Sequence, residues 1–252
     1  MKEMIERDNP ALTEPKLTLR RAEDRGQADH GWLQARFTFS FAEYFDPQQM
    51  GFQALRVMNN DRIQPRGGFP SHPHRDMEIF TYVISGKLRH EDSLGNGSTI
   101  QAGDLQYMSA GSGIRHSEFN PSASEPTRLY QIWLKPNETG GQPRYAEKAL
   151  QAHHQKNELE LLFDGEGKDN VTAIRQNAAI YFGSLEGGKQ ITVPASRSRP
   201  HVWIQTVIGD IQVLGADLHE ADGLQIENAP DEFKIEARTP AKFLVFRLQT
   251  ES

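Results

Sequence analysis

The chain has 252 residues, 37% hydrophobic and 25% charged, which is typical of a globular protein long enough to bury a sizeable core. Its formal net charge of −6 argues against direct nucleic-acid binding through neutralised phosphates. There is no cysteine, which excludes disulfides, iron–sulfur clusters and thiolate zinc sites.

The first sixteen residues, 1–16, are rich in charged residues and proline and lack the apolar core of a signal peptide. We predict that they form an N-terminal extension. No later stretch is long and apolar enough to span a membrane. The expected location is therefore the cytoplasm, with no membrane partner.

Short runs rich in β-branched and aromatic residues lie between frequent glycines and prolines. They are Gln53–Met58, Glu78–Ile84, Gly103–Met108, Leu129–Leu134, Val202–Ile208, Asp210–Leu214 and Ala241–Leu248. Such spacing predicts an all-β sandwich or barrel fold. The segment Arg144–Leu162 has a helix-forming composition, and we expect it to be a short helix that connects two halves of the chain.

Two short clusters carry the candidate metal ligands, His72-Pro73-His74 and His116-Ser117-Glu118. In each cluster one residue separates the two candidates, so on an extended strand both point to the same face. Pro73 cannot donate to a sheet ladder, which places the first cluster at a sheet edge or at the start of a strand. Side by side, the two strands would aim three imidazoles and one carboxylate at a common point. Such a site keeps open positions and suits Fe, Cu, Ni, Mn or Zn.

Spacing alone leaves the carboxylate ligand open between Glu78 and Glu118. Glu78 shares the parity of His72 and His74, and a His-x-His-x3-Glu run is the first motif of the wider cupin superfamily. One of the two glutamates would then hydrogen-bond to a ligand instead of binding the metal.

Other aromatic and histidine residues are predicted to be structural. The alternating segment Phe37–Phe41 is expected to pack in a core or between two barrels instead of stacking on a substrate. His30 and His90 stand beside Asp29 and Glu91 and are expected at the surface, where hydrogen bonding accounts for them.

A weak internal repeat predicts two halves of similar design. Phe80–Lys87 and Ile204–Asp210 are each an apolar strand that ends in a glycine turn. When the two are aligned, Ala195 and Arg197 take the positions of the first histidine pair. Neither residue offers an imidazole, so the second half is expected to be a barrel without a metal.

Three stretches resemble the pirin family: Asn59-Asn60-Asp61 through Gly68, His72–Glu78 and Met108–Asn120. The match runs from about Leu17 to the C-terminus and is sparse in the second half. The bacterial pirin-like proteins described as quercetin 2,3-dioxygenases are the most similar. The resemblance implies a bicupin, with two β-barrel (jelly-roll) cupin domains packed face to face. The domains expected are an N-terminal metal-binding barrel over residues 17–137 and a connecting segment with a second barrel over residues 138–252.

The resemblance also implies a ligand set and an activity. The family's ligands fall on His72, His74, His116 and Glu118, with one divalent metal, Fe(II) first and Cu, Ni, Mn or Zn as alternatives. The implied reaction opens a flavonol, or a related small aromatic enol, with dioxygen and releases carbon monoxide. Glu118 would be the catalytic residue, taking the substrate's hydroxyl proton.

Two other functions remain open. One is a regulatory binding protein whose affinity for a partner responds to metal or redox state, and the other is a structural cupin with an incidental metal. The intact ligand set argues against the structural protein. An apolar pocket above the metal would favour the enzyme, and an exposed patch elsewhere would favour the regulator. We expect a monomer, with a protein partner left open.

Overall fold

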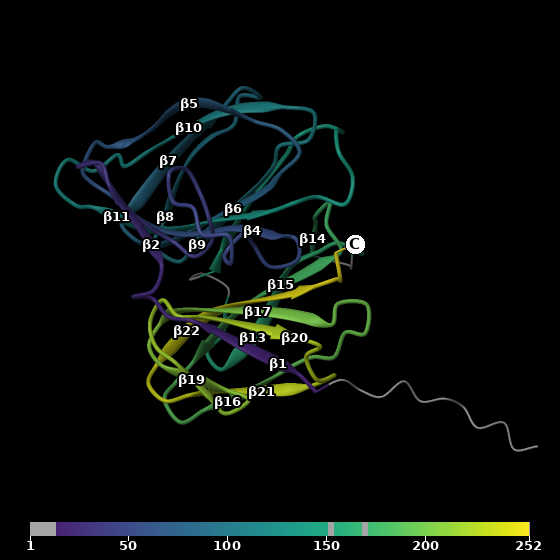
Figure 1. Ribbon diagram of the computed structural model, residues 1–252. Coiled ribbons are helices and arrows are strands. Elements are labelled where there is room, and N and C mark those ends of the chain that lie inside the picture. Colours follow the sequence, from purple (N-terminus) through teal and green to yellow (C-terminus); the bar gives the residue numbers. More distant parts are fainter. Residues whose placement is uncertain (1–13, 151–153, 168–170, 252) are drawn as a thin grey trace, which may run out of the picture.

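The computed structural model describes residues 14–150, 154–167 and 171–251, so most of the predicted extension, residues 1–13, lies outside the described part. Four sheets make two barrels, and Figure 1 shows the first barrel (blue and teal) above the second (green and yellow). The all-β bicupin expected from the sequence is confirmed. No helix among the described residues is long and apolar enough to cross a membrane.

A seven-stranded and a four-stranded sheet form the first barrel. The large sheet has the order β12 (Arg144–Ala149), β9 (Asp104–Ser109), β6 (Glu78–Ser85), β11 (Thr127–Leu134), β4 (Leu55–Ile63), β3 (Leu33–Phe37) and β2 (Gly26–Asp29). The small sheet has the order β5 (Gly68–His74), β10 (Ile114–Phe119), β7 (Lys87–Asp92) and β8 (Gly97–Gln101). Ile63, Val83 and Leu129 of the large sheet pack against Leu88 and Ile100 of the small one, and this cluster closes the barrel.

The second barrel repeats this plan. Its large sheet has the order β1 (Lys16–Arg20), β20 (Gly223–Glu227), β17 (His201–Ile208), β22 (Ala241–Leu248), β15 (Ala178–Leu185), β13 (Glu158–Asp164) and β14 (Thr172–Ala173). Its small sheet has the order β16 (Gln190–Val193), β21 (Phe233–Ala237), β18 (Ile211–Val213) and β19 (Ala216–Leu218). Thus β6 and β17, the strands of the predicted repeat, occupy equivalent places. Each is followed by a glycine of positive φ, Gly86 at 80° and Gly209 at 77°. The internal repeat is confirmed.

The first strand of the chain belongs to the second barrel. β1 pairs with β20 of that barrel, whereas β12, which follows β11 directly in the chain, pairs with β9 of the first barrel. The first barrel is therefore built from the unbroken run β2 to β12, and the second from β13 to β22 together with β1. Main-chain hydrogen bonds of β1 thus tie the start of the chain to the second barrel.

The barrels pack through the outer faces of their large sheets. Successive side chains of a strand point to opposite faces, so on β6 Phe80 joins the buried cluster between the barrels while Val83 fills the first barrel. The Phe80 ring lies 5.0 Å from that of Phe163, and the Phe39 ring lies 5.2 Å from that of Trp203. These contacts hold the two barrels face to face.

The helix expected over Arg144–Leu162 is wrong. β12 and β13 occupy most of this segment, and residues 151–153 lie outside the described part. Helix propensity is a weak preference, and here pairing of β12 with β9 and of β13 with β15 overrides it.

The site depends on how closely β5 lies against β10. β5 is an edge strand, as Pro73 predicted, and it runs antiparallel to β10 with His72 opposite His116. The register shifts between His116 and Glu118, which is the mark of a β-bulge or irregularity. Near the start of β5 a Cβ on Gly68 would overlap the carbonyl oxygen of Glu118. Only glycine allows this approach.

We expect replacement of Gly68 by alanine to lower the free energy of unfolding by about 1–3 kcal/mol, because an overpacked site forces the backbone to shift. Denaturant unfolding measures the change. Gly97→Ala on β8 is the matched control, since the nearest atoms to an added Cβ there are 3.9 Å away. Equal stability of the two variants would contradict the close pairing of β5 with β10.

Candidate metal centre

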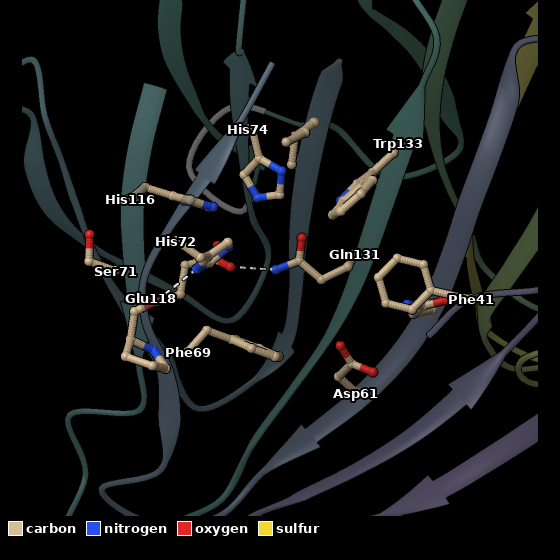
Figure 2. Close-up of a pocket in the computed structure, with 13 residues that line it drawn as sticks. Phe41, Asp61, Phe69, Ser71, His72, His74, His116, Glu118, Gln131 and Trp133 are labelled. Atoms are coloured by element: carbon tan, nitrogen blue, oxygen red, sulfur yellow. Dashed lines mark hydrogen bonds between the residues drawn. The ribbon is translucent and has the colours of Figure 1, made fainter. Parts of the chain in front are cut away.

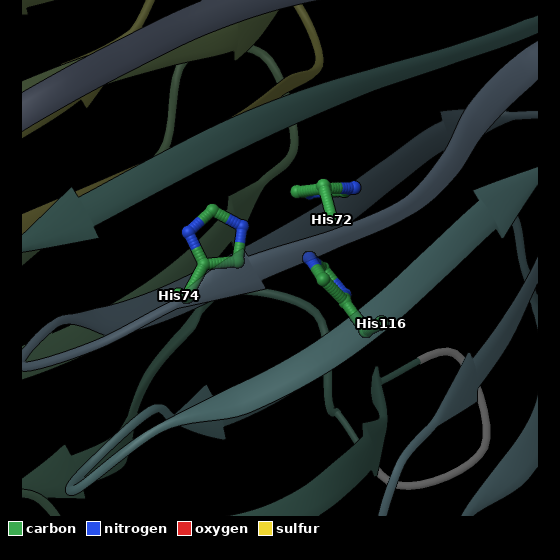
Figure 3. A group of neighbouring side chains, drawn as sticks. All are labelled: His72, His74 and His116. Carbon is green, nitrogen blue, oxygen red and sulfur yellow. The ribbon is translucent and has the colours of Figure 1, made fainter.

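Three histidines meet where β5 lies against β10. The ring centroid of His72 is 4.4 Å from that of His116 and 4.8 Å from that of His74, and the His74 and His116 centroids are 4.9 Å apart. Their candidate ligand atoms all lie within 4.8 Å of one another, and Figure 3 shows the rings turned toward a common point. The prediction that the two clusters lie on adjacent strands is confirmed.

His72 and His116 each have a ring nitrogen whose lone pair can bind a metal. The His72 Nδ1 atom lies 2.8 Å from the carbonyl oxygen of Pro70, so its N–H donates there and Nε2 is left as the lone-pair donor. The Nε2 atom of His116 is buried and has no hydrogen-bond partner within residues 14–150, 154–167 and 171–251. Buried ring nitrogens are normally paired. A metal ion among the three rings would pair it, so these residues fit a metal and form a histidine metal site.

The surroundings keep two of these imidazoles neutral. Burial lowers the pKa of His74 to about 4, with a smaller effect from His72. Burial also lowers the pKa of His116 to about 2, helped by the neighbouring His72, His74 and His90. A neutral imidazole has its lone pair free, so protons compete little with a metal for His74 and His116 near neutral pH.

Glu118 lies beside the histidine cluster. One of its carboxylate oxygens comes within 4.8 Å of ligand atoms of His90 and His116. Gln131 Nε2 donates to its Oε2 at 2.8 Å and Thr81 Oγ1 lies 3.3 Å from its Oε1, and Figure 2 shows the Gln131 bond as a dashed line. Burial raises the pKa of Glu118 to about 7, while the two hydrogen bonds pull it down. A nearby cation would favour the ionised form further.

Glu78 lies on the face of β6 that points away from Glu118 and toward the second barrel. Its carboxylate accepts hydrogen bonds from the Tyr107 hydroxyl at 2.5 Å, from the Ser109 hydroxyl and from the backbone N–H of Arg175 at 2.9 Å. Of the two glutamates that spacing left open, Glu118 is the one beside the histidines.

The expectation that His90 lies at the surface is wrong. Its side chain is fully buried on the inner face of β7, and across the sheet it pairs with Glu118. Its Nδ1 lies 3.4 Å from His116 Nδ1, and its Nε2 lies 3.4 Å from Asp92 Oδ2. His90 thus supports the His116 ring from behind. The alternation along Lys87–Asp92, which places His90 on the face of Leu88, was the signal that could have found it.

A cavity of about 380 Å³, hereafter the metal pocket, opens onto the cluster. Its walls are mainly apolar and aromatic, and the lining residues are Phe41, Asn59, Asp61, Phe69, Pro70, Ser71, His72, His74, Ile79, His116, Glu118, Gln131 and Trp133. The Trp133 ring meets the His74 ring edge to face at 4.9 Å and the Phe41 ring at 5.4 Å. Trp133 thus stands beside His74 at the edge of the cluster (Figure 2).

The aromatic segment Phe37–Phe41 divides between three places. Phe37 fills the first barrel and Phe39 packs between the barrels, as expected. Phe41 packs against the core cluster of the first barrel and also lines the metal pocket.

The equivalent strands of the second barrel carry a filled apolar core. On β16 and β21, Val193, Phe233 and Ile235 are buried in the cluster inside that barrel. Both candidate metal clusters found in the described part of the chain belong to the first barrel.

Comparisons with known proteins match both halves. The family model "Pirin" matches residues 18–134, and the model "Quercetinase C-terminal cupin domain" matches residues 161–248. The protein named "Quercetin 2,3-dioxygenase" from Escherichia coli (strain K12) is 43% identical over 230 residues, which cover 91% of this chain and 97% of that protein. A "Pirin-like protein" from Caulobacter vibrioides is 42% identical over 204 residues, covering 81% of this chain and 87% of that protein.

Two solved structures extend the likeness to three dimensions. The crystal structure of YhhW from Escherichia coli superposes with a TM-score of 0.88 at 41% identity, covering 94% of this chain and 99% of that chain. YhhW in complex with nickel(II) gives a TM-score of 0.87 at 41% identity, covering 94% of this chain and 100% of that chain.

We expect purified protein to bind one metal per chain, and the His74→Ala variant to lose most of it, because one of three imidazoles is removed. Elemental analysis after dialysis measures the content. The exposed His219 of the second barrel, replaced by alanine, is the matched control. A full equivalent in His74→Ala, or two tightly held equivalents in the unmodified protein, would contradict the expectation.

Proposed function

The chain belongs to the pirin family, and on that basis we propose that it is a metal-dependent dioxygenase that opens a flavonol ring with dioxygen and releases carbon monoxide. The observation that carries the proposal is the metal pocket, whose mainly apolar walls end at the histidine cluster and Glu118. Enzymes hold planar aromatic substrates in concave, mostly apolar pockets with a few convergent polar groups. The homologous Escherichia coli protein named for this activity supports the same reaction.

We propose that His72, His74, His116 and Glu118 hold one divalent metal, with Fe(II) as the native ion. Nitrogen and oxygen donors of this kind also suit Cu, Ni, Mn and Zn, and the related YhhW has been solved with nickel(II). When bound, such an ion acidifies a hydroxyl that coordinates to it and gives substrate and dioxygen a common binding point.

Glu118 is the proton acceptor in this proposal. A flavonol carries a hydroxyl beside its ring ketone, and the reaction with dioxygen requires the electron-rich, deprotonated form. Gln131 and Thr81 hold the Glu118 carboxylate in place through its two oxygens. Ligating a metal and accepting a proton both need the ionised carboxylate, so one residue can serve in both roles.

The aromatic walls position the substrate. Phe41 and Trp133 stand on one side of the metal pocket and Phe69 on another, with the Phe69 ring 6.3 Å from the His72 ring. A flat ring system entering between them would displace water and bring its hydroxyl toward Glu118. Excluding water strengthens the electrostatic interactions within the site.

Replacing Glu118 with glutamine is expected to lower flavonol turnover per bound metal by ~10²–10⁴-fold, because the variant keeps an oxygen ligand but loses the base. Oxygen uptake measures the rate, and it must be divided by metal content because the lost charge also weakens metal binding. Glu91→Gln, an exposed glutamate on β7, is the control. Near-normal turnover per metal in Glu118→Gln would place the base elsewhere, with Asp61 the other carboxyl that lines the pocket.

Anaerobic reconstitution with Fe(II), Cu(II), Ni(II), Mn(II) or Zn(II), followed by a panel of flavonols, tests the activity itself. We expect oxygen uptake with carbon monoxide release for at least one redox-active metal, iron first. No turnover with any of the five metals would reject the dioxygenase in favour of a metal-responsive regulatory protein.

A further inference from the structure

A second cavity of about 330 Å³ adjoins the metal pocket and shares four of its lining residues, Phe41, Asn59, Asp61 and Phe69. We call it the outer chamber. Its remaining walls include Trp32 and Phe37 and contain none of the histidines of the metal centre. The two hollows therefore lie side by side, and the histidines of the metal centre border only the metal pocket.

Two buried polar side chains that line both hollows each carry an unpaired acceptor atom. Asn59 and Asp61 both point inward from β4 and are 3% exposed each. The Oδ1 atoms of both residues have no hydrogen-bond partner among the residues that the structure describes. A buried acceptor left unpaired lowers stability, because it loses its hydrogen bonds to water without replacing them. The fold pairs a comparable buried carboxyl directly, since Arg21 Nη1 lies 2.7 Å from Asp222 Oδ2. No cation in the described part of the chain pairs with Asp61 in this way, and a donor from a bound ligand would satisfy its Oδ1 atom.

Aromatic rings flank this polar junction. The Trp32 and Phe69 rings meet edge to face at 5.1 Å, and the Phe37 ring lies 5.9 Å from that of Phe41. Figure 2 places Phe41 and Asp61 on the side of the metal pocket away from His116. A ligand that spans both hollows would thus have one end at the metal and a second, flat ring between aromatic walls, next to two hydrogen-bond acceptors.

We propose that the outer chamber binds the phenyl substituent of the substrate, and that Asp61 and Asn59 select phenyl rings bearing hydroxyl groups. The inference rests on the proposed function for the end of the substrate that faces the metal. A phenolic hydroxyl donates to the Asp61 carboxylate, and the Asn59 side chain accepts from or donates to its neighbour. The substrate class is therefore a hydroxylated aryl group joined to a chelating bicyclic enol, rather than the bicyclic enol alone.

Ligand binding to Zn(II)-loaded protein, measured by calorimetry without oxygen, tests the inference independently of turnover. Three probes are compared: a flavonol with a catechol ring, the same flavonol with an unsubstituted phenyl ring, and the hydroxychromone that lacks the phenyl ring. Burial raises the pKa of Asp61 to about 7, with a smaller effect from Glu118, so the comparison is made above pH 7. We expect the catechol form to bind ~10–100-fold more tightly there than the unsubstituted form, as a hydrogen bond to a charged group implies. Asp61→Leu should remove this preference.

A second variant tests the chamber while leaving both acceptor residues in place. Ala35 lies opposite Asp61 on β3 and lines the outer chamber but not the metal pocket. Ala35→Leu should reduce the affinity for both phenyl-bearing flavonols relative to hydroxychromone by ~10-fold or more, because overpacking the chamber leaves no room for the ring. Ala149→Leu, at an exposed position of β12, is the control and should leave the ratios unchanged.

The outcomes separate this inference from the proposed reaction. Unchanged probe ratios in both Asp61→Leu and Ala35→Leu would overturn the assignment of the chamber, even if the protein turned over flavonols. Altered ratios in protein that releases no carbon monoxide with any metal would uphold the chamber and reject the dioxygenase.

Discussion

The antiparallel pairing of β5 with β10 is the constraint on which the site depends. Direct cross-strand partners lie close together in such a ladder, and here the partners are His72 and His116. Because one residue separates His72 from His74 on β5, His74 lies on the same face. β10 is also hydrogen-bonded to β7, which brings His90 behind His116 and opposite Glu118. The metal centre is therefore a consequence of sheet register, held in place by Gly68, where no side chain fits between the strands.

The same barrel fold encloses a metal site in the first barrel and a closed apolar core in the second. In the first barrel, Thr81, Gln131 and Asn59 lie side by side across β6, β11 and β4 and face inward. The equivalent row in the second barrel is Ile204, Val245 and Tyr181, all packed in the apolar cluster inside that barrel. Polar side chains in the first row hold Glu118 and leave a pocket, whereas the second row closes its barrel. The second barrel thus supplies packing area that stabilises the first.

The features that could be predicted from the sequence are those that depend on a residue pattern within a single strand. The histidine pairs, the edge position marked by Pro73 and the repeat of β6 and β17 all follow from alternation and turn residues. Parity could not choose between Glu78 and Glu118, because β5 ends at His74 and Asp76 adopts a φ of 51° before β6 begins, so alternation does not carry through the turn. His90 was missed because its neighbour Glu91 is exposed, although strand alternation buries every second residue. The placement of β1 in the second barrel depends on contacts between distant segments, which local propensity does not encode.

The most direct test of the account is an anomalous-scattering map of crystals of the Fe(II)-reconstituted protein, recorded at the iron absorption edge. The account requires one iron peak per chain, bounded by the Nε2 atoms of His72 and His116, a ring nitrogen of His74 and a carboxylate oxygen of Glu118, and facing the metal pocket. A peak at Glu78, a second peak between β16 and β21, or no peak at the three histidines would contradict it.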